Sequence, residues 1–525
     1  MASAVLVLLG ALFVPRVAQA VPGQATRLGG IGPQGPATPS VTALHHNPAM
    51  LGALRGSAFA VSIAGSLEQE RVRRAAIDPA TGEPMGGLDG PTSIVHPGMG
   101  YFLGASFYFD PVAIGVGIYD VGSQARLTGA DPLRYHLAPD PNPGCLRIGV
   151  KHCPPNGGQV SYRHDVTLGI AYDGGAFQLG AGLHLPMIRE RFAFDNDTAL
   201  GSRGSESSVC TNKEDPACAE RIGFKGWTQW VPRNGAPPGF DAAITVGFGL
   251  QLANETVRLG GRYRTFPLRR GGEVALGGIA LVCRPTAGAA EADVGVPVCS
   301  DADPIRATLR ERVPQELALG GSFLLGRSRV WRLDLNLYWL DLCQGGVQRA
   351  KCKDGGQQVL RLVGLDRRAF VLPEFGRYRG LQDIYGIDAY VSWKAHARAT
   401  VLFAGHGNTA PVRRSAAVAG SGGGARIGIS AGAQVKISTR RRTRTTLLLT
   451  PGYGLDVSLP RTVTAARAAF SPAAAGQFAD AGGDINAPGA DLVLGGRARP
   501  TNAGRYFGLV HTLTLALAWG DAFTE

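Results

Sequence analysis

Residues 331–339 read WRLDLNLYW, and this stretch decides the fold class. Every odd position carries an apolar side chain, from Trp331 to Trp339, whereas the even positions carry Arg332, Asp334, Asn336 and Tyr338. Successive side chains of a β-strand point to opposite faces. The stretch therefore predicts a strand with one apolar face and one largely polar face.

The same alternation recurs along the chain, for example over residues 240–252 and 426–437. Most of these segments have about ten residues or more, the length that a tilted strand needs to cross a membrane. We predict about fourteen strands, an even number as bacterial barrels require. They are 57–69, 99–110, 112–123, 159–173, 176–192, 239–253, 256–267, 314–326, 329–342, 383–395, 398–407, 424–438, 444–458 and 505–519.

A soluble β-sandwich would also alternate, so other features must decide. The polar faces include glycines and charged residues, which the lumen of a barrel tolerates. Aromatic residues stand near the ends of the apolar rows, as in the interfacial girdles of membrane barrels; they are Trp331, Trp339, Trp393, Trp519, Tyr162 and Tyr172. The sequence thus predicts an all-β fold, a transmembrane antiparallel β-barrel in the outer membrane.

The connections alternate in length, which is an independent signal. The short ones lie at 110–111, 173–175, 254–255, 326–328, 396–397 and 439–442. The long ones span 70–98, 124–158, 193–238, 268–313, 343–382, 408–423 and 459–504. Outer-membrane barrels have short periplasmic turns and long external loops. A chain that starts in the periplasm would place each long connection outside the cell.

Composition agrees with strands and turns. Glycine makes up 75 of 525 residues, and only 18% of residues are charged, against typical shares of about 7% and about 25%. Glycine at that level weakens helices. The net charge of +13 is spread along the chain, and no nucleic-acid recognition motif accompanies it, so nucleic acid is not an expected partner.

The N-terminal residues divide the chain into three parts. Residues 1–20 resemble a secretory signal, with an apolar stretch from Ala4 to Val14 and a small-x-small cleavage site at Ala18-Gln19-Ala20. The first residues lack Lys and Arg, so a membrane anchor is the alternative, although the stretch is shorter than the roughly 20 residues that span a bilayer. We assign 21–56 to a lumenal or periplasmic segment and 57–525 to the barrel.

Eight cysteines fall into four pairs that are close in sequence. They are Cys145 with Cys153, Cys210 with Cys218, Cys283 with Cys299, and Cys343 with Cys352. Neighbours in sequence pair most readily because short loops close with little loss of entropy, although the sequence does not prove the connectivity. Zinc is the rival interpretation, but no pair has a CxxC spacing. We expect disulfides that staple external loops without a core of their own.

The segment 21–56 is rich in Gly and Pro and leads into Ala43-Leu44-His45-His46-Asn47-Pro48-Ala49-Met50-Leu51. It resembles the N-terminal hatch of the FadL-like outer-membrane transporters of long-chain fatty acids and aromatic hydrocarbons, which ends in an Asn-Pro-Ala motif, here Asn47, Pro48 and Ala49. Residues 313–320, VPQELALG, resemble the Pro-led start of a mid-barrel strand in that family. The last strand, with Leu513, Leu515, Leu517 and Trp519 on one face, resembles the C-terminal strand that barrel-assembly machinery recognises.

The resemblance implies a hatch-plugged barrel that takes up hydrophobic small molecules passively. Its expected partners are a hydrophobic ligand, outer-membrane lipid and lipopolysaccharide, and the barrel-assembly machinery, with the chain acting as a monomer. It also implies a lateral opening beside a kinked strand. We place that kink in the third strand, near Gly115, Gly117 and Gly122, because Gly permits bulges and close bends. The equally plausible alternative is that these glycines are thin lumen positions.

The sequence gives no sign of catalysis. No nucleophile, base and orienting group form a known signature, and no cofactor motif is present, so neither an enzyme nor a cofactor is expected. His45 and His46 could bind a metal only with distant help, and we expect no metal site. Lumen-facing charges should brace the wall or, less plausibly, form a constriction that selects solutes; they are Arg163, Asp165, Arg332, Asp334 and Asp388.

Two other functions remain open at this point. A general or ion-selective porin would have a lumen free of a plug and would conduct ions. A structural or adhesive surface barrel would use its external loops to bind a partner. The sequence gives neither the substrate nor the direction of transport.

Overall fold

The structure is a computed structural model. It describes residues 34–77, 84–85, 92–120, 124–125, 160–197, 219–228, 241–253, 255–268, 272–283, 305–326, 328–342, 358–363, 374–377, 381–412, 424–440, 445–463 and 499–523. The predicted signal peptide, Gly122 and every cysteine except Cys283 lie outside these ranges. Cys283 is the last residue of a strand whose side chain there is not described, so the disulfides stay a prediction.

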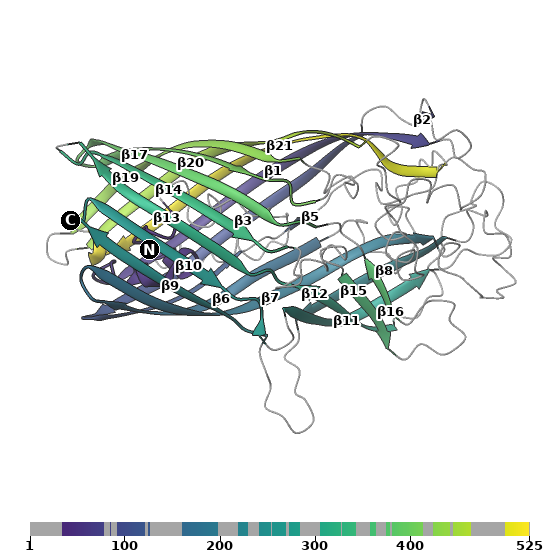
Figure 1. The fold of residues 1–525 in the computed structure, drawn as a ribbon, viewed down its shortest axis with the longest axis horizontal. Helices are drawn as coiled ribbons and strands as arrows, with labels where there is room; N and C mark the ends of the chain where they lie inside the picture. Colours follow the sequence, from purple (N-terminus) through teal and green to yellow (C-terminus); the bar gives the residue numbers. More distant parts are fainter. Residues whose placement is uncertain are drawn as a thin grey trace, which may run out of the picture.

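Fourteen strands form a closed antiparallel barrel (Figure 1), in which the last strand pairs with the first from Ala58↔Gly520 to Ile77↔Arg499. In chain order they are β1 (Ala58–Ile77), β3 (Thr92–Phe109), β4 (Val112–Asp120), β6 (Val160–Asp173), β7 (Phe177–Asp197), β9 (Ala243–Leu252), β10 (Val257–Arg264), β13 (Glu316–Leu325), β14 (Trp331–Leu340), β17 (Ile384–His396), β18 (Ala399–Asn408), β19 (Arg426–Arg440), β20 (Thr445–Val463) and β21 (Arg499–Gly520). Each predicted strand corresponds to one of these, so the predicted fold class is confirmed.

Alternation assigns each side chain to a face, as the sequence predicts. On β14, Leu335 and Leu337 are 40% and 57% exposed on the outside, whereas Asp334 and Asn336 face inward and are buried. Aromatic rings stack on the outer surface, Trp331 with Trp393 at 5.5 Å and Phe59 with Trp519 at 5.4 Å between ring centroids. An apolar outer face with aromatic residues near the strand ends is the architecture of outer-membrane barrels. Among the described residues, no helix is both long and apolar enough to cross a membrane.

Five further strands extend the wall at the end opposite the C-terminus (Figure 1). β8 (Ala219–Thr228) pairs with the final residues of β7, and β11 (Glu273–Cys283), β12 (Ile305–Arg312), β15 (Gln358–Val363) and β16 (Glu374–Arg377) follow in order. Two short strands, β2 (Pro84–Met85) and β5 (Gln124–Ala125), pair with β1 and β6.

The expectation that these loops lack a core is wrong. Phe224, Leu276 and Leu309 of the added strands are almost completely buried. A signal for them exists in the sequence, because Ile305, Ala307 and Leu309 alternate with polar residues. Apolar side chains on one face of a strand are buried when another layer of structure covers that face. These loops therefore do not depend on disulfides alone for their structure.

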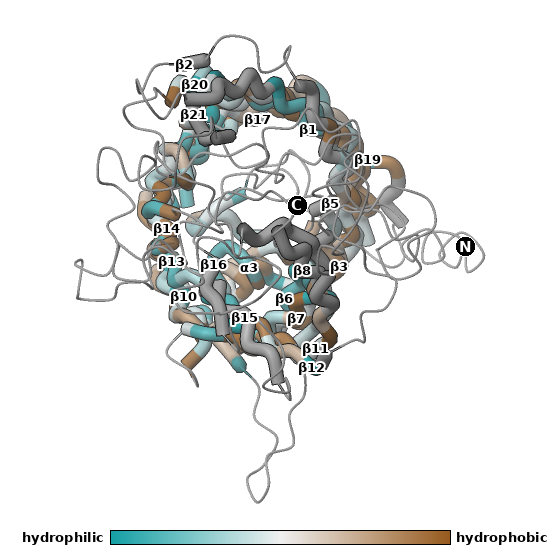
Figure 2. Tube along the Cα trace, turned by 90° about the vertical axis from the view of Figure 1, so that its right-hand side faces the viewer, coloured by the Kyte–Doolittle hydropathy of each residue, from teal (hydrophilic) through white to brown (hydrophobic). Residues whose placement is uncertain are grey.

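The remaining elements are short helices: α3 (Ala43–His46), η1 (Pro48–Leu51) and η10 (Asp521–Phe523). Viewed along the barrel, α3 lies inside the ring of strands (Figure 2). Residues 34–56, called the inner segment below, contain α3 and η1 and are mostly buried. The inner segment and the wall that it touches are the feature of the fold that bears on function.

Candidate functional site

The inner segment crosses the lumen between opposite walls. At its start, Asn336 Nδ2 of β14 donates to the Gln34 carbonyl at 2.7 Å, and Thr38 Oγ1 donates to Asp334 at 3.0 Å. Further along, Val41 lies against Gly104 of β3, and Leu44 packs against β4 and β6. Since β14 is seven strands away from β3 around the fourteen-stranded ring, the two ends of this span contact opposite sides of the barrel.

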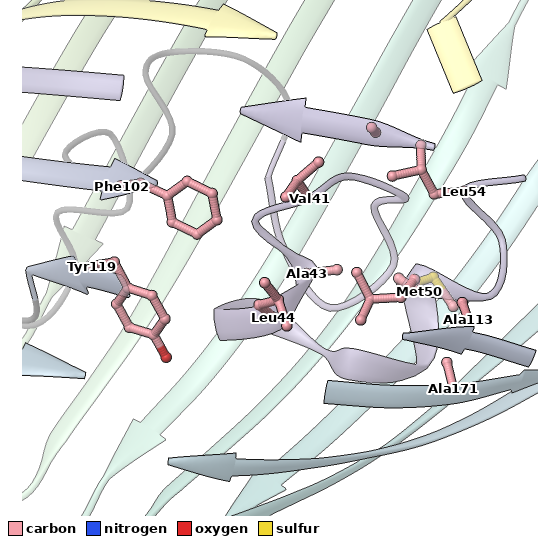
Figure 3. Packing of buried hydrophobic residues seen from close by; sticks show 11 residues of the cluster. Val41, Ala43, Leu44, Met50, Leu54, Phe102, Ala113, Tyr119 and Ala171 are labelled. Carbon is pink, nitrogen blue, oxygen red and sulfur yellow. The ribbon is translucent and has the colours of Figure 1, made fainter. Parts of the chain in front are cut away.

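An apolar cluster fixes the far end of that span (Figure 3). Val41, Leu44, Met50 and Leu51 of the inner segment are buried together with wall residues that include Phe102, Ala113, Tyr119 and Ala171. The rings of Phe102 and Tyr119 stack at 5.9 Å between centroids and border the cluster. Burial of a Leu or Met side chain stabilises by roughly 1.5–3 kcal/mol, so this cluster favours a docked inner segment.

Asn47 joins the inner segment to itself and to the wall. Its side-chain Nδ2 donates to the Pro36 carbonyl at 2.6 Å and to the Phe248 carbonyl of β9 at 2.8 Å. Its Oδ1 accepts a hydrogen bond from the Ala49 amide at 3.1 Å. Asn47 is thus the N-cap of η1, followed by Pro48 at the position where Pro suits a helix start. The predicted Asn-Pro-Ala motif is buried inside the barrel, while its role as a hatch stays a prediction.

Glycines in the wall make room for the backbone of the inner segment. A Cβ on Gly180 would lie 2.6 Å from Ala49 Cα, and one on Gly260 would lie 2.6 Å from the Pro36 carbonyl carbon. On Gly247 and Gly249 it would collide with Asn47 and Met50. These glycines lie on β7, β9 and β10, and no local pattern distinguished them from other glycines in the sequence. At Gly180 and Gly260 the close approach of a second backbone requires Gly, whereas at Gly247 and Gly249 side chains of the inner segment fill the space.

The glycines proposed for a kink behave in a similar way where they are described. β4 pairs with β3 and β6 without a register shift over Val112–Asp120. A Cβ on Gly115 or Gly117 would lie 3.0 Å from a methyl group of Leu44. At both positions the wall therefore carries no side chain, and the inner segment packs directly against the strand. Gly122 lies outside the described residues, and the lateral opening stays a prediction.

Two arginines, Arg262 of β10 and Arg55 of the inner segment, join the segment to the wall through charge-assisted bonds. Arg262 donates to the His45 carbonyl and, at 2.5 Å, to Glu316 of β13. At the other end of the inner segment, Arg55 Nε lies 3.2 Å from Asp173 Oδ2. Such bonds are about twice as strong as neutral ones. The sequence analysis did not single out Arg262, since nothing local shows which lumen-facing arginine lies opposite the segment.

A buried polar network lies beside the apolar cluster. His184 Nδ1 is 3.0 Å from the hydroxyls of Tyr119 and Thr167, and its Nε2 is 2.7 Å from the hydroxyl of Thr245. Arg264 donates to Asp165 at 2.5 Å. These groups occupy five strands, and the hydrogen bonds fix their relative positions. No three His, Cys, Asp or Glu side chains within the described ranges are placed to hold a metal ion.

Most of the lumen-facing charged residues singled out in the sequence form ion pairs with other lumen-facing residues. Arg163 bonds to Glu190 at 3.1 Å and also to Glu311 of β12, which ties the added strands to the barrel. Asp165 pairs with Arg264, as described above, and Arg332 with Asp334 at 2.8 Å. Asp388 differs, because it forms no ion pair among the described residues; its Oδ1 also has no hydrogen-bond partner there.

The pKa values of His45 and His46 are both shifted by the site. Burial and the neighbouring charge of Arg262 lower the pKa of His46 to about 3, and the same causes lower the pKa of His45 well below its usual value. His46 Nε2 lies 3.1 Å from Gln34 Oε1, within the inner segment. Both rings are therefore neutral when the segment is docked.

We expect docking of the inner segment to weaken in acid. A free segment takes up protons as the pH falls below about 6.5, whereas the docked His46 resists protonation until about pH 3. Docking is therefore strongest above pH 6.5. Below that pH, the equilibrium constant for docking falls about tenfold per pH unit for each His. Limited proteolysis of the segment at about pH 7.5 and about pH 5 measures this. The variant H45Q/H46Q should show no such dependence, and an equal dependence in both proteins would contradict the prediction.

Solved structures share this fold over nearly the whole chain. A FadL homologue of Pseudomonas aeruginosa matches with a TM-score of 0.63 and 13% identity, covering 96% of this chain and 100% of its own. The P. putida toluene transporter TodX matches with a TM-score of 0.53 and 12% identity, covering 93% and 95%. The Ralstonia pickettii toluene transporter TbuX gives 0.55 and 12%, covering 93% and 96%. No family model and no curated protein matches the sequence, so these likenesses concern the fold.

Proposed function

We propose that the protein is an outer-membrane transporter for the passive uptake of hydrophobic small molecules, with the inner segment as its hatch. The proposal includes a monomeric barrel in contact with lipid and lipopolysaccharide. Long-chain fatty acids and aromatic hydrocarbons are the substrate classes that we infer from the resemblance of residues 21–56 and 313–320. Two of the structural neighbours are named as toluene transporters, which supports the choice of an aromatic probe.

The inner segment carries this proposal. Its apolar cluster lies against β3, β4 and β6, and Asn47 and Arg262 bond it to β9 and β10. The bonds of Gln34 and Thr38 attach it to β14 on the opposite side of the lumen. A general porin needs an unobstructed path for water and ions. A segment attached across the lumen instead favours a channel that admits ligands selectively.

Uptake by cells tests the proposal. A host that lacks its own transporter would express the full chain or a form without residues 21–56, and would receive labelled toluene or oleate. We expect cells that express the full chain to take up more of the labelled probe than cells with an empty vector. Equal uptake with and without the protein would contradict the proposal.

Ion conductance separates the proposal from the porin alternative. The purified full chain in a planar bilayer should pass little current, whereas the form without residues 21–56 should conduct. Steady conductance by the full chain would favour a general porin. Loss of surface attachment on deletion of the external loops, with toluene uptake unchanged, would show an additional adhesive role.

A further inference from the structure

A row of polar side chains continues around the wall beyond the contacts of the inner segment. In the pairing register, Asn336 of β14 lies opposite Asp388 of β17, and Asp388 lies opposite His406 of β18. His406 lies opposite Gly428 of β19, which lies opposite Asp456 of β20. All of these positions face the lumen, because the residues beside them, such as Ile387 and Phe403, are exposed on the outer surface.

One end of this polar row is internally paired. His406 Nε2 lies 2.8 Å from Asp456 Oδ1. The two side chains reach each other across Gly428, where any Cβ would collide with both. Nearby, Arg426 pairs with Glu68 at 2.5 Å. His406 and Arg426 are thus already paired with carboxylates.

The middle of the row has two side-chain atoms without a hydrogen-bond partner among the described residues. Asp388 is only 7% exposed, and its Oδ1 has no hydrogen-bond partner among the described residues. The same is true of the Tyr338 hydroxyl. Tyr338 lies opposite Gly386, two residues before Asp388 on the same face of β17, and its ring occupies the space that a Cβ on Gly386 would take. The two groups therefore belong to one patch of the lumen wall.

Their chemistry specifies a ligand group. Asp388 offers an acceptor, and the Tyr338 hydroxyl can donate or accept. A ligand hydroxyl can donate to the first and bond to the second, so it would satisfy both. A ligand carboxylate would lie beside the carboxyl groups of Asp388 and Asp456, and the cations in the pairs described above are already bound to carboxylates. A pure hydrocarbon would leave both groups unsatisfied, which buried polar groups rarely tolerate.

We propose that Asp388 and Tyr338 form a subsite for the hydroxyl group of an otherwise apolar ligand, such as a phenol or a long-chain alcohol. This inference rests on the proposed uptake function and narrows its substrate class. Binding at this subsite discriminates among hydrophobic molecules by one polar group, because a site that bonds a hydroxyl disfavours the analogue that lacks it.

Three ligands with the same ring test the subsite: p-cresol, toluene and p-toluate. Calorimetric titration of the purified full chain in detergent should give binding of p-cresol about fivefold tighter than toluene, the effect of about one net hydrogen bond. We expect p-toluate to bind more weakly than p-cresol. No binding of p-cresol, or equal binding of p-cresol and toluene, would overturn the proposal.

Substitution locates the effect. Tyr338→Phe should bring p-cresol to the affinity of toluene and leave toluene unchanged, and Asp388→Leu should act in the same direction. Tyr385→Phe is the matched control on β17, since Tyr385 is 57% exposed on the outer face. If Tyr338→Phe weakens p-cresol no more than Tyr385→Phe does, the subsite does not exist. Because Tyr338→Phe keeps the ring, a normal heat-modifiable band on a gel should verify folding.

Cell uptake separates this inference from the proposed function. Uptake of toluene that depends on the chain, without preference for p-cresol in binding, would leave the function standing and remove the subsite. Tight binding of p-cresol without uptake of any probe would support the subsite and contradict the function.

Discussion

A barrel that carries Gly180→Ala and Gly260→Ala is expected to conduct ions, whereas the wild-type barrel passes little current. The two added methyl groups would lie within 2.6 Å of the backbone of residues 48–49 and of Pro36, respectively. Backbone cannot rotate away as a side chain can, so the inner segment must shift. Overpacking costs about 1–3 kcal/mol at each site. Both changes together should shift the docking equilibrium by about a hundredfold or more.

Conductance in a planar bilayer and limited proteolysis of residues 34–56 measure this displacement. Gly454→Ala is the matched control, because its methyl group would meet Ser430 Cβ at 3.4 Å, an ordinary contact on a lumen-facing position of β20. The control should behave like the wild type in both assays. Unaltered conductance and protease resistance in the double variant would show that the inner segment does not depend on these contacts.

Asn47→Ala is expected to release the inner segment without adding volume. The substitution leaves the Pro36 and Phe248 carbonyls and the Ala49 amide without the partner that Asn47 supplies. Each buried group left unsatisfied costs about 1–3 kcal/mol. The sum, about 3 kcal/mol or more, corresponds to roughly a hundredfold weaker docking. If the segment is the hatch, Asn47→Ala should also raise ion conductance.

Asn408→Ala provides the comparison for Asn47→Ala. Asn408 is likewise buried on the lumen face, but its Nδ2 donates to the neighbouring Thr409 carbonyl at 2.8 Å rather than to the inner segment. Protease cleavage of residues 34–56 should therefore increase in Asn47→Ala alone. Equal cleavage of the two variants would mean that Asn47 does not anchor the segment.

The added strands show where sequence patterns fall short. Residues 305–312 alternate clearly, but β12 is only eight residues long and pairs with β11 and β15 rather than with a barrel strand. Whether an alternating segment joins the barrel wall or a sheet beyond it depends on which neighbours it pairs with, and pairing is not a local property.

The sequence by itself determined the wall of this protein. Because the side-chain period of a strand is two, each residue's face follows from its own position in a short segment, and length and turn spacing then identify fourteen membrane strands.

Only the tertiary structure decided what lies inside the wall. Closure of the barrel brings Arg264 to Asp165, which is 99 positions away, and Thr38 to Asp334, which is 296 positions away. The alternation of strand faces shows that Arg264, Asp165 and Asp334 face the lumen, but the register around the ring and the path of the inner segment decide which side chains meet. Asp388 lies on an alternating strand as Asp334 does, but the register places it opposite Asn336 and His406, and its Oδ1 has no hydrogen-bond partner among the described residues.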